Sequence, residues 1–216
     1  MRQRTTGCRF LQCGAYICKI NISFFLDLCY NIIRFIAQEK FSLIFEKYLL
    51  PDRMAASYRD VTSEYLTAHG IRLLICDIDN TLVTYDDPEP TDELKEWFQS
   101  MERDGVTVAF VSNNHAERVE KFNSSLGYIA FADARKPFTG RIKDVIKKAG
   151  ADTKCTALLG DQLLTDAAAA KRSGVHCLIV PPIKDKTTFF FRFKRWIEKP
   201  YIKKYKKLHS EMNEHD

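Results

Sequence analysis

Short apolar stretches alternate with amphipathic helical patterns through the middle of the chain, and this alternation limits the folds that the chain can adopt. The apolar stretches begin at Ile71, Val106, Ile129, Thr156 and His176. The helical patterns cover residues 92–103, 116–126, 140–149 and 163–173, and are closed by Gly105, Gly127, Gly150 and Gly174. Such alternation predicts an α/β fold with a parallel sheet and right-handed crossovers, in which ligands bind at the carboxyl ends of the strands.

The length and composition favour one domain with an extension at each end. A chain of 216 residues with 45% hydrophobic residues can bury a sizeable core. We expect an N-terminal extension over residues 1–44, the main domain over 45–184 and a basic, aromatic tail over 185–216. Residues 52–69 have a helical pattern that Gly70 ends before the first strand.

Two carboxylates follow the first apolar stretch. Asp77 and Asp79 are one residue apart, so they could converge at the mouth of a sheet if the backbone turns there. The two charges repel each other, and a divalent cation such as Mg²⁺, which prefers oxygen ligands, would relieve the repulsion. The pair therefore suggests metal-assisted phosphoryl chemistry, although a solvated turn after a buried strand is the simpler interpretation of such a pair taken alone.

Polar groups also follow the later strands. Ser112 and Asn113 follow the second strand and could bind phosphate oxygens, whereas Lys136 follows the third and could neutralise a carboxylate and a phosphoryl group. Asp161 and Asp166 lie in an acidic loop after the fourth strand, where a third metal ligand is available. Taken singly, these residues are more often turn residues, solvated charges or helix N-terminal acids.

Taken in order, the segments DIDNT, SNN, RKP and GDxxxTD resemble the four motifs of the haloacid dehalogenase (HAD) superfamily of phosphatases, and the resemblance spans residues 45–193. More specifically, the chain is similar to the YqeG-like HAD IIIA family in the motif segments DIDNTLV, VSNN, ARKP and GDQLLTD and in the preceding segment FEKYLLPD. That family is related to fungal mitochondrial phosphatidylglycerophosphate phosphatase. The resemblance implies a Rossmann-like three-layer sandwich with a mostly parallel sheet.

The resemblance also implies roles for the motif residues. Asp77 would be the nucleophile that forms an aspartyl-phosphate, and Asp79 would protonate the leaving oxygen and later activate water. Mg²⁺ would be held by Asp77, Asp161 and the backbone carbonyl of Asp79, with Asp166 acting directly or through a neighbouring ligand.

The phosphoryl oxygens would be held by Thr81, Ser112, Asn113 and Lys136. Simpler roles stay open for Thr81 as a cap of its turn, for Asn113 as an ordinary turn residue and for Asp166 as an acid at a helix N-terminus. His115 receives no functional role.

The intervals between the motifs are too short for the inserted cap domain that many HAD enzymes carry. Neither residues 82–106 nor residues 114–136 can bury a core of their own. The resulting open site could accept a phosphate on a large carrier, or a partner subunit could supply the lid. The leading hypothesis is hydrolysis of phosphatidylglycerophosphate to phosphatidylglycerol. The alternatives are a soluble small-molecule or protein phosphatase and, from another class, a non-catalytic phosphate-binding adaptor.

The tail FFFRFKRWIEKPYIKKYKK mixes aromatic residues with cations. On a helical wheel Phe189, Phe190, Phe193, Trp196 and Ile197 form an apolar arc opposite Arg192, Lys194, Arg195 and Lys199, with Phe191 on the cationic side. Such a helix suits an anionic membrane interface. Alternatively, the apolar arc covers the sheet and the basic face is in water.

Residues 20–37 are apolar, but Asp27, Asn31 and Arg34 interrupt them at helical spacing. A membrane span would bury Asp27 near its centre, and a signal peptide does not tolerate such an interruption. The segment is either an interfacial anchor, or it lies upstream of a true start near Phe45.

The remaining composition limits partners and compartment. The formal net charge of +5 does not demand nucleic acid, and an oligomer is left open. Cys76, Cys155 and Cys177 lie in or beside predicted strands, and the four N-terminal cysteines lack a C-x-x-C pair, so a zinc or iron–sulfur site is not expected. We therefore predict a cytoplasmic protein, with a peripheral position at the inner face of the membrane left open.

Overall fold

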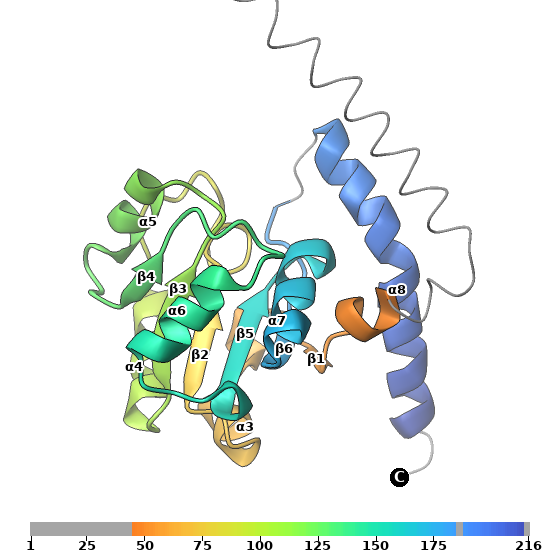
Figure 1. Cartoon of the computed structure of the whole chain (residues 1–216), viewed down its shortest axis with the longest axis horizontal. Coiled ribbons are helices and arrows are strands. Elements are labelled where there is room, and N and C mark those ends of the chain that lie inside the picture. The colour runs from red at the N-terminus through yellow and green to blue at the C-terminus, as the bar shows by residue number, and fades with distance from the viewer. Residues whose placement is uncertain (1–44, 185–187, 214–216) are drawn as a thin grey trace, which may run out of the picture. The chain divides into compact units, whose positions relative to one another are not determined.

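A six-stranded parallel sheet forms the centre of the protein, in a computed structural model that describes residues 45–184 and 188–213 (Figure 1). The strands are β1 (Arg53–Met54), β2 (Leu73–Cys76), β3 (Thr107–Val111), β4 (Ile129–Phe131), β5 (Thr156–Gly160) and β6 (His176–Ile179). They are arranged in the order β1-β6-β5-β2-β3-β4, and every neighbouring pair is parallel. The predicted α/β fold is thus confirmed.

Helices follow the strands as the sequence predicts. The longer ones are α3 (Ser63–Ala68), α4 (Asp92–Arg103), α5 (Ala116–Asn123), α6 (Gly140–Lys148), α7 (Ala168–Ser173) and α8 (Phe189–Asn213). Residues 45–49 are also helical, and short turns are formed by η1 (Tyr58–Asp60), η2 (Thr153–Cys155) and the π-helical η3 (Leu163–Ala167). The glycines after the helices adopt positive φ; Gly174, for example, ends α7 at a φ of 71°.

The side chains of the sheet alternate between two helical layers. Leu74 and Cys76 of β2 belong to one buried cluster with Leu66 of α3 and Phe98 of α4. On the opposite face, α6 packs against β2, β3 and β4 (Figure 1). Both faces of the sheet are covered, which explains why all four residues of β2 are apolar and buried. The result is the expected three-layer sandwich.

The prediction of a helix over residues 52–69 is wrong for its first half. Residues Arg53 and Met54 instead form β1, which pairs with Leu178 and Ile179 of β6. The free edge of β6 offers backbone hydrogen bonds, and this tertiary pairing outweighs the local helical pattern. Helix α3 starts only after Thr62, whose hydroxyl accepts a hydrogen bond from the Tyr65 backbone N–H.

The four motif loops lie at the carboxyl ends of the central strands. From β2 the chain passes to β3 and β4 on one side, and then to β5 and β6 on the other, so the strand order reverses at β2. Between β2 and β3 the described chain contains one helix, α4, and between β3 and β4 it contains one helix, α5. The absence of a cap domain between these motifs is therefore confirmed.

Helix α8 packs through a different face from the one that the helical wheel predicts. Phe191 and Glu198 are buried, whereas Phe189 is 72% exposed and Trp196 is 57% exposed. Of the predicted apolar arc, only Ile197 is buried and Phe193 is half-buried; the side chain of Phe190 lies outside the described part of the chain. The buried face predicted from the helical wheel is wrong because polar contacts between α8 and the loop after β5 set the orientation of the helix.

Within the described residues, none of the helices combines the length and the apolar character that crossing a lipid bilayer requires. The segment 20–37 and the four N-terminal cysteines lie outside the described residues. Cys76 and Cys177 lie in β2 and β6 and are buried free thiols, and Cys155 directly precedes β5 and is a half-buried free thiol.

Candidate active site

Asp77 lies directly at the carboxyl end of β2. Its backbone N–H still donates to the carbonyl of Leu159 in β5, at 2.8 Å, which fixes the residue at the edge of the sheet. Its side chain is buried, and Thr81 Oγ1 lies 3.4 Å from its Oδ2. Thr81, predicted to contact phosphate, thus lies beside the carboxylate itself.

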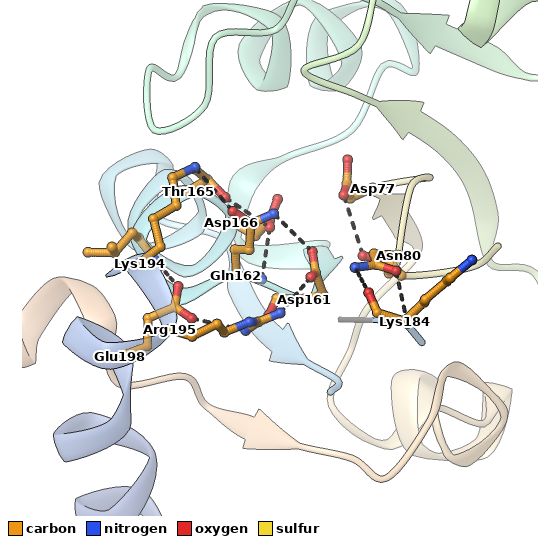
Figure 2. Close-up of polar contacts among 12 residues, drawn as sticks. Asp77, Asn80, Asp161, Gln162, Thr165, Asp166, Lys184, Lys194, Arg195 and Glu198 are labelled. Atoms are coloured by element: carbon orange, nitrogen blue, oxygen red, sulfur yellow. Dashed lines mark hydrogen bonds and ion pairs between the residues drawn. The ribbon is translucent and has the colours of Figure 1, made fainter. Parts of the chain in front are cut away.

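A tight turn follows, built on Asn80 in the left-handed region with a φ of 70°. Asparagine tolerates this conformation better than most residues. The Asn80 side chain bonds both backbone groups of Lys184, donating to its carbonyl at 2.7 Å and accepting from its N–H at 3.0 Å (Figure 2). The segment after β6 therefore holds the turn that separates Asp77 from the rest of its loop.

Lys136 bridges two of the predicted carboxylates. Its Nζ lies 2.7 Å from Asp77 Oδ1 and 2.7 Å from Asp166 Oδ1, and its side chain is 2% exposed. Burial alone would lower the pKa of this ammonium group, but Asp166 and Asp77 outweigh burial and raise it. The lysine is thus held as a buried cation beside the Asp77 carboxylate.

The π-helical turn η3 places Asp166. The backbone N–H groups of Asp166 and Ala167 both donate to the Gln162 carbonyl, at 2.8 and 3.2 Å, which widens the turn. Asp166 Oδ2 accepts from the Gln162 N–H at 3.1 Å. A Cβ at Gly160 would come within 2.4 Å of the Asp166 Cβ and Cγ, so the close approach of the carboxylate needs a glycine.

Three buried carboxylates meet here. One oxygen from each of Asp77, Asp161 and Asp166 lies within 4.8 Å of the others. Burial raises the pKa of Asp77 to about 6, with Lys136 opposing that shift, and burial also raises the pKa of Asp161. Concentrated negative charge in a dry site is costly unless a cation compensates it.

The donors fit a divalent metal ion. Asp166 Oδ1 is buried, and its ion pair with Lys136 Nζ at 2.7 Å leaves it able to contact a further cation. The three carboxylates of the cluster outnumber the two cations that contact them, Lys136 and Arg195. An all-oxygen donor set with this residual charge is typical of sites for hard divalent cations.

Asp79 occupies different surroundings from Asp77. Its Oδ2 accepts from the Asn114 amide at 2.9 Å, and its Oδ1 pairs with the Arg118 guanidinium at 2.9 Å. Arg118 also donates to the carbonyls of Asp87 and Pro88, at 2.8 and 3.0 Å. Asp79 is not one of the three carboxylates that meet within 4.8 Å, so its side chain has different partners from that of Asp77.

Ser112 and Asn113 lie at the end of β3. The Asn113 side chain bonds the backbone of Lys136, accepting from its N–H at 2.7 Å and donating to its carbonyl at 3.3 Å. This amide therefore holds the lysine loop, whose peptide bond to Pro137 is cis. Ser112 Oγ accepts from the Asn114 N–H at 3.0 Å and is buried.

These groups surround one open cavity of about 260 Å³. Its lining includes Asp77, Asp79, Ser112, Asn113, Lys136 and Asp166. Tyr85 also lines it. The predicted residues therefore come together from four separate loops, with Thr81 beside Asp77 and Asp161 in the carboxylate cluster.

Sequence reasoning missed several residues of the site. Asn114 stands within the SNN segment but received no role, and Arg118 is a helix residue without a motif. Arg195 and Glu198 come from α8, and Arg195 donates to Asp161 Oδ2 at 2.8 Å. The position of Asn114, two residues after Ser112, could have indicated its place in the site. No sequence pattern indicated Arg118 or Arg195.

The chain is similar to known phosphatases. Residues 133–182 match the HAD-hydrolase-like family model. The chain is 35% identical over 154 residues to "Probable phosphatase YqeG" of Bacillus subtilis, which covers 71% of this chain and 90% of that protein. The chain belongs to the YqeG-like family of HAD superfamily phosphatases. It is accordingly a HAD-type phosphatase, a phosphoric monoester hydrolase.

Solved structures with a weaker resemblance to this YqeG-like phosphatase include two further phosphatases. The cobalt-bound deoxy-D-mannose-octulosonate 8-phosphate phosphatase of Haemophilus influenzae has 16% identity and a TM-score of 0.43, over 63% of this chain and 90% of that chain. The 3-deoxy-D-manno-octulosonate 8-phosphate phosphatase of Moraxella catarrhalis has 16% identity and a TM-score of 0.37, over 68% of this chain and 97% of that chain.

Proposed function

We propose that this YqeG-like phosphatase hydrolyses a phosphomonoester through an aspartyl-phosphate on Asp77. The observation that carries the proposal is the contact of Asp77 with Lys136, inside a cluster of three buried carboxylates. An Asp77 oxygen attacks phosphorus while the bond from phosphorus to the ester oxygen breaks. Asp79 gives its proton to the leaving oxygen, then takes one from the water that hydrolyses the aspartyl-phosphate and restores the carboxylate.

Mg²⁺ is the cation that we propose for the carboxylate cluster. Asp77, Asp161, Asp166 and the backbone carbonyl of Asp79 would hold it, since these are hard oxygen donors. When bound, it supplies positive charge that offsets the repulsion between a phosphate and the carboxylates. Thr81, Ser112 and Lys136 would position the phosphoryl oxygens, while Asn113 holds the Lys136 backbone.

The substrate class that we propose is an anionic membrane phosphate, with phosphatidylglycerophosphate as the leading example. No cap domain covers the cavity within the described chain, so a phosphate on a bulky carrier can approach it. The outer side of α8 exposes Phe189 and Trp196 together with Arg192, Lys199 and Lys203. Aromatic side chains among cations suit the interface of an anionic membrane, which would place the protein at its inner face.

A substrate panel tests this proposal. Full-length protein with Mg²⁺ is assayed at equal phosphate concentrations with phosphatidylglycerophosphate in mixed micelles, a sugar phosphate, a nucleoside monophosphate and a phosphopeptide. We expect kcat/KM for the lipid to exceed the others by about tenfold or more, the range that extra binding contacts give. Equal or better turnover of a soluble ester would contradict the lipid assignment, and no turnover of any ester would contradict the reaction.

Sedimentation with vesicles tests the exposed side of α8 separately. The double variant Phe189→Ser/Trp196→Ser should bind anionic vesicles more weakly than the wild type, whereas Leu208→Ser, another exposed apolar residue of α8, should change binding little. Neutral vesicles serve as the control for charge. If the wild type remains in the supernatant with anionic vesicles at low salt, the membrane contact is refuted.

A further inference from the structure

The acidic loop after β5 is held by a helix that begins about thirty residues later in the chain. Arg195 of α8 donates through Nη1 to the Asp161 carbonyl at 2.9 Å and through Nη2 to Asp161 Oδ2 at 2.8 Å (Figure 2). Because one guanidinium group grips both the backbone and the side chain of Asp161, the carboxylate cannot rotate freely. Its other oxygen, Oδ1, has a long contact of 3.5 Å with the Gln162 side-chain amide.

Arg195 is itself fixed from two sides. Its Nη1 also donates to Glu198 Oε2 at 2.9 Å, and its guanidinium lies 5.0 Å from the centre of the Phe191 ring. Only 17% of its side chain is exposed. A cation that is stacked on a ring and paired with a carboxylate is already oriented before it contacts Asp161.

Glu198 extends the same contact to the turn that places Asp166. It is fully buried, and its Oε1 accepts from the Leu164 N–H at 3.1 Å, at the start of η3. This N–H is one of the groups that a helical turn leaves without an internal partner. Arg195 and Glu198, three residues apart on α8, therefore support the loops of both Asp161 and Asp166.

The identity of these two residues is not explained by helix docking alone. Burying an ion pair carries a large desolvation cost, and apolar residues of similar size commonly dock a helix as well or better. Here both charged residues contact the backbone or side chains of the acidic loop, rather than simply each other. Their contacts point to a role in fixing that loop.

We propose that Arg195 and Glu198 are positioning residues that set Asp161 and the η3 turn for the divalent cation, so that α8 forms part of the metal site. The inference rests on the proposed function, because it assumes that the carboxylate cluster binds Mg²⁺. Groups that hold metal ligands in place commonly change metal affinity by about 10- to 100-fold when they are removed.

The test measures Mg²⁺ affinity of the full-length, metal-free protein by titration calorimetry, with the Mg²⁺-dependent rise in melting temperature as a second readout. Arg195→Gln should weaken Mg²⁺ binding by about 10- to 100-fold. Arg192→Gln removes the same charge from an exposed position of the same helix, and should leave the affinity within about twofold. Arg195→Lys keeps the charge but loses the planar guanidinium group that makes two hydrogen bonds to Asp161. Its Mg²⁺ affinity should therefore lie between those of the wild type and Arg195→Gln.

Each result has a distinct meaning. Unchanged affinity in Arg195→Gln would overturn the positioning role, and tighter binding would show instead that Arg195 competes with the cation for Asp161. If Arg195→Gln fails to fold, Glu198→Gln tests the same contact, because glutamine keeps the shape of the side chain and one hydrogen-bond acceptor. This variant should bind Mg²⁺ several-fold more weakly than the wild type. Equal affinity would also overturn the proposal. A wild-type protein that binds no Mg²⁺ would refute the proposed metal site itself.

Discussion

Asp77 and Asp79 are separated by one residue, yet their carboxylates meet different surroundings. Asp77 contacts Lys136 and shares a buried cluster with Asp161 and Asp166. Asp79 is held by an amide, from Asn114, and by a guanidinium group, from Arg118. One turn of the chain thus gives two chemically identical groups different electrostatic environments.

The separation has a local cause. Ile78, between the two aspartates, is fully buried in the core, which directs the flanking side chains away from the core. The turn at Asn80 then bends the chain, and Asn114 and Arg118 capture the Asp79 side chain. Two environments are what an enzyme requires of a nucleophile and an acid–base residue.

The largest effect is expected at Asp77. Asp77→Asn should lower turnover of every phosphate ester by on the order of 10⁴-fold or more, because the nucleophile is lost. The variant should remain folded, since it removes one charge from a crowded cluster. Steady-state phosphate release and a melting curve measure both effects, with the exposed Asp144→Asn as the matched control. Turnover above about 1% of wild type would refute the nucleophile assignment.

The effect at Asp79 should be smaller and should depend on the leaving group. Asp79→Asn should slow hydrolysis of an alkyl phosphate by about 10²- to 10⁴-fold, the usual contribution of general acid–base catalysis. An aryl phosphate needs little protonation, so its first step should continue and release a burst of about one equivalent of phenol before water attack stalls. Rapid-mixing absorbance measures the burst. Equal losses for both esters, without a burst, would contradict the role of Asp79 in protonating the leaving group.

A substitution at Gly160 tests whether the Asp77 side of the site depends on the close approach of Asp166 to Gly160. Gly160→Ala would place a methyl group 2.4 Å from Asp166 Cβ, so the carboxylate must move. We expect kcat to fall about tenfold or more, since small misplacements of catalytic groups are costly, and stability to fall by about 1–3 kcal/mol. Kinetics and urea unfolding measure the two effects.

Gly140→Ala is the matched control for that substitution. Gly140 has open space around its Cβ position and begins α6, so alanine there should be neutral or slightly stabilising. Equal behaviour of the two alanine variants would show that Asp166 does not need its present position.

Much of the fold was predictable because its signals are local. The apolar stretches before Asp77, Ser112 and Asp161 predict parallel strands, and the carboxyl ends of such strands share one edge of a sheet. The strand β1 was not predictable, because two residues carry too little periodicity and the pairing partner β6 lies far along the chain.

From the amino-acid sequence alone one could predict the alternation of strands and helices from β2 onward, the family, and the polar residues that lie at the edge of the sheet. The tertiary structure alone decided that Asn113 holds the Lys136 backbone, that η3 widens to place Asp166 and that α8 faces the core through Phe191, Arg195 and Glu198. Strand and turn signals act between neighbours in the chain. The contact between Asp161 and Arg195 instead joins residues 34 positions apart, so no local sequence pattern encodes it.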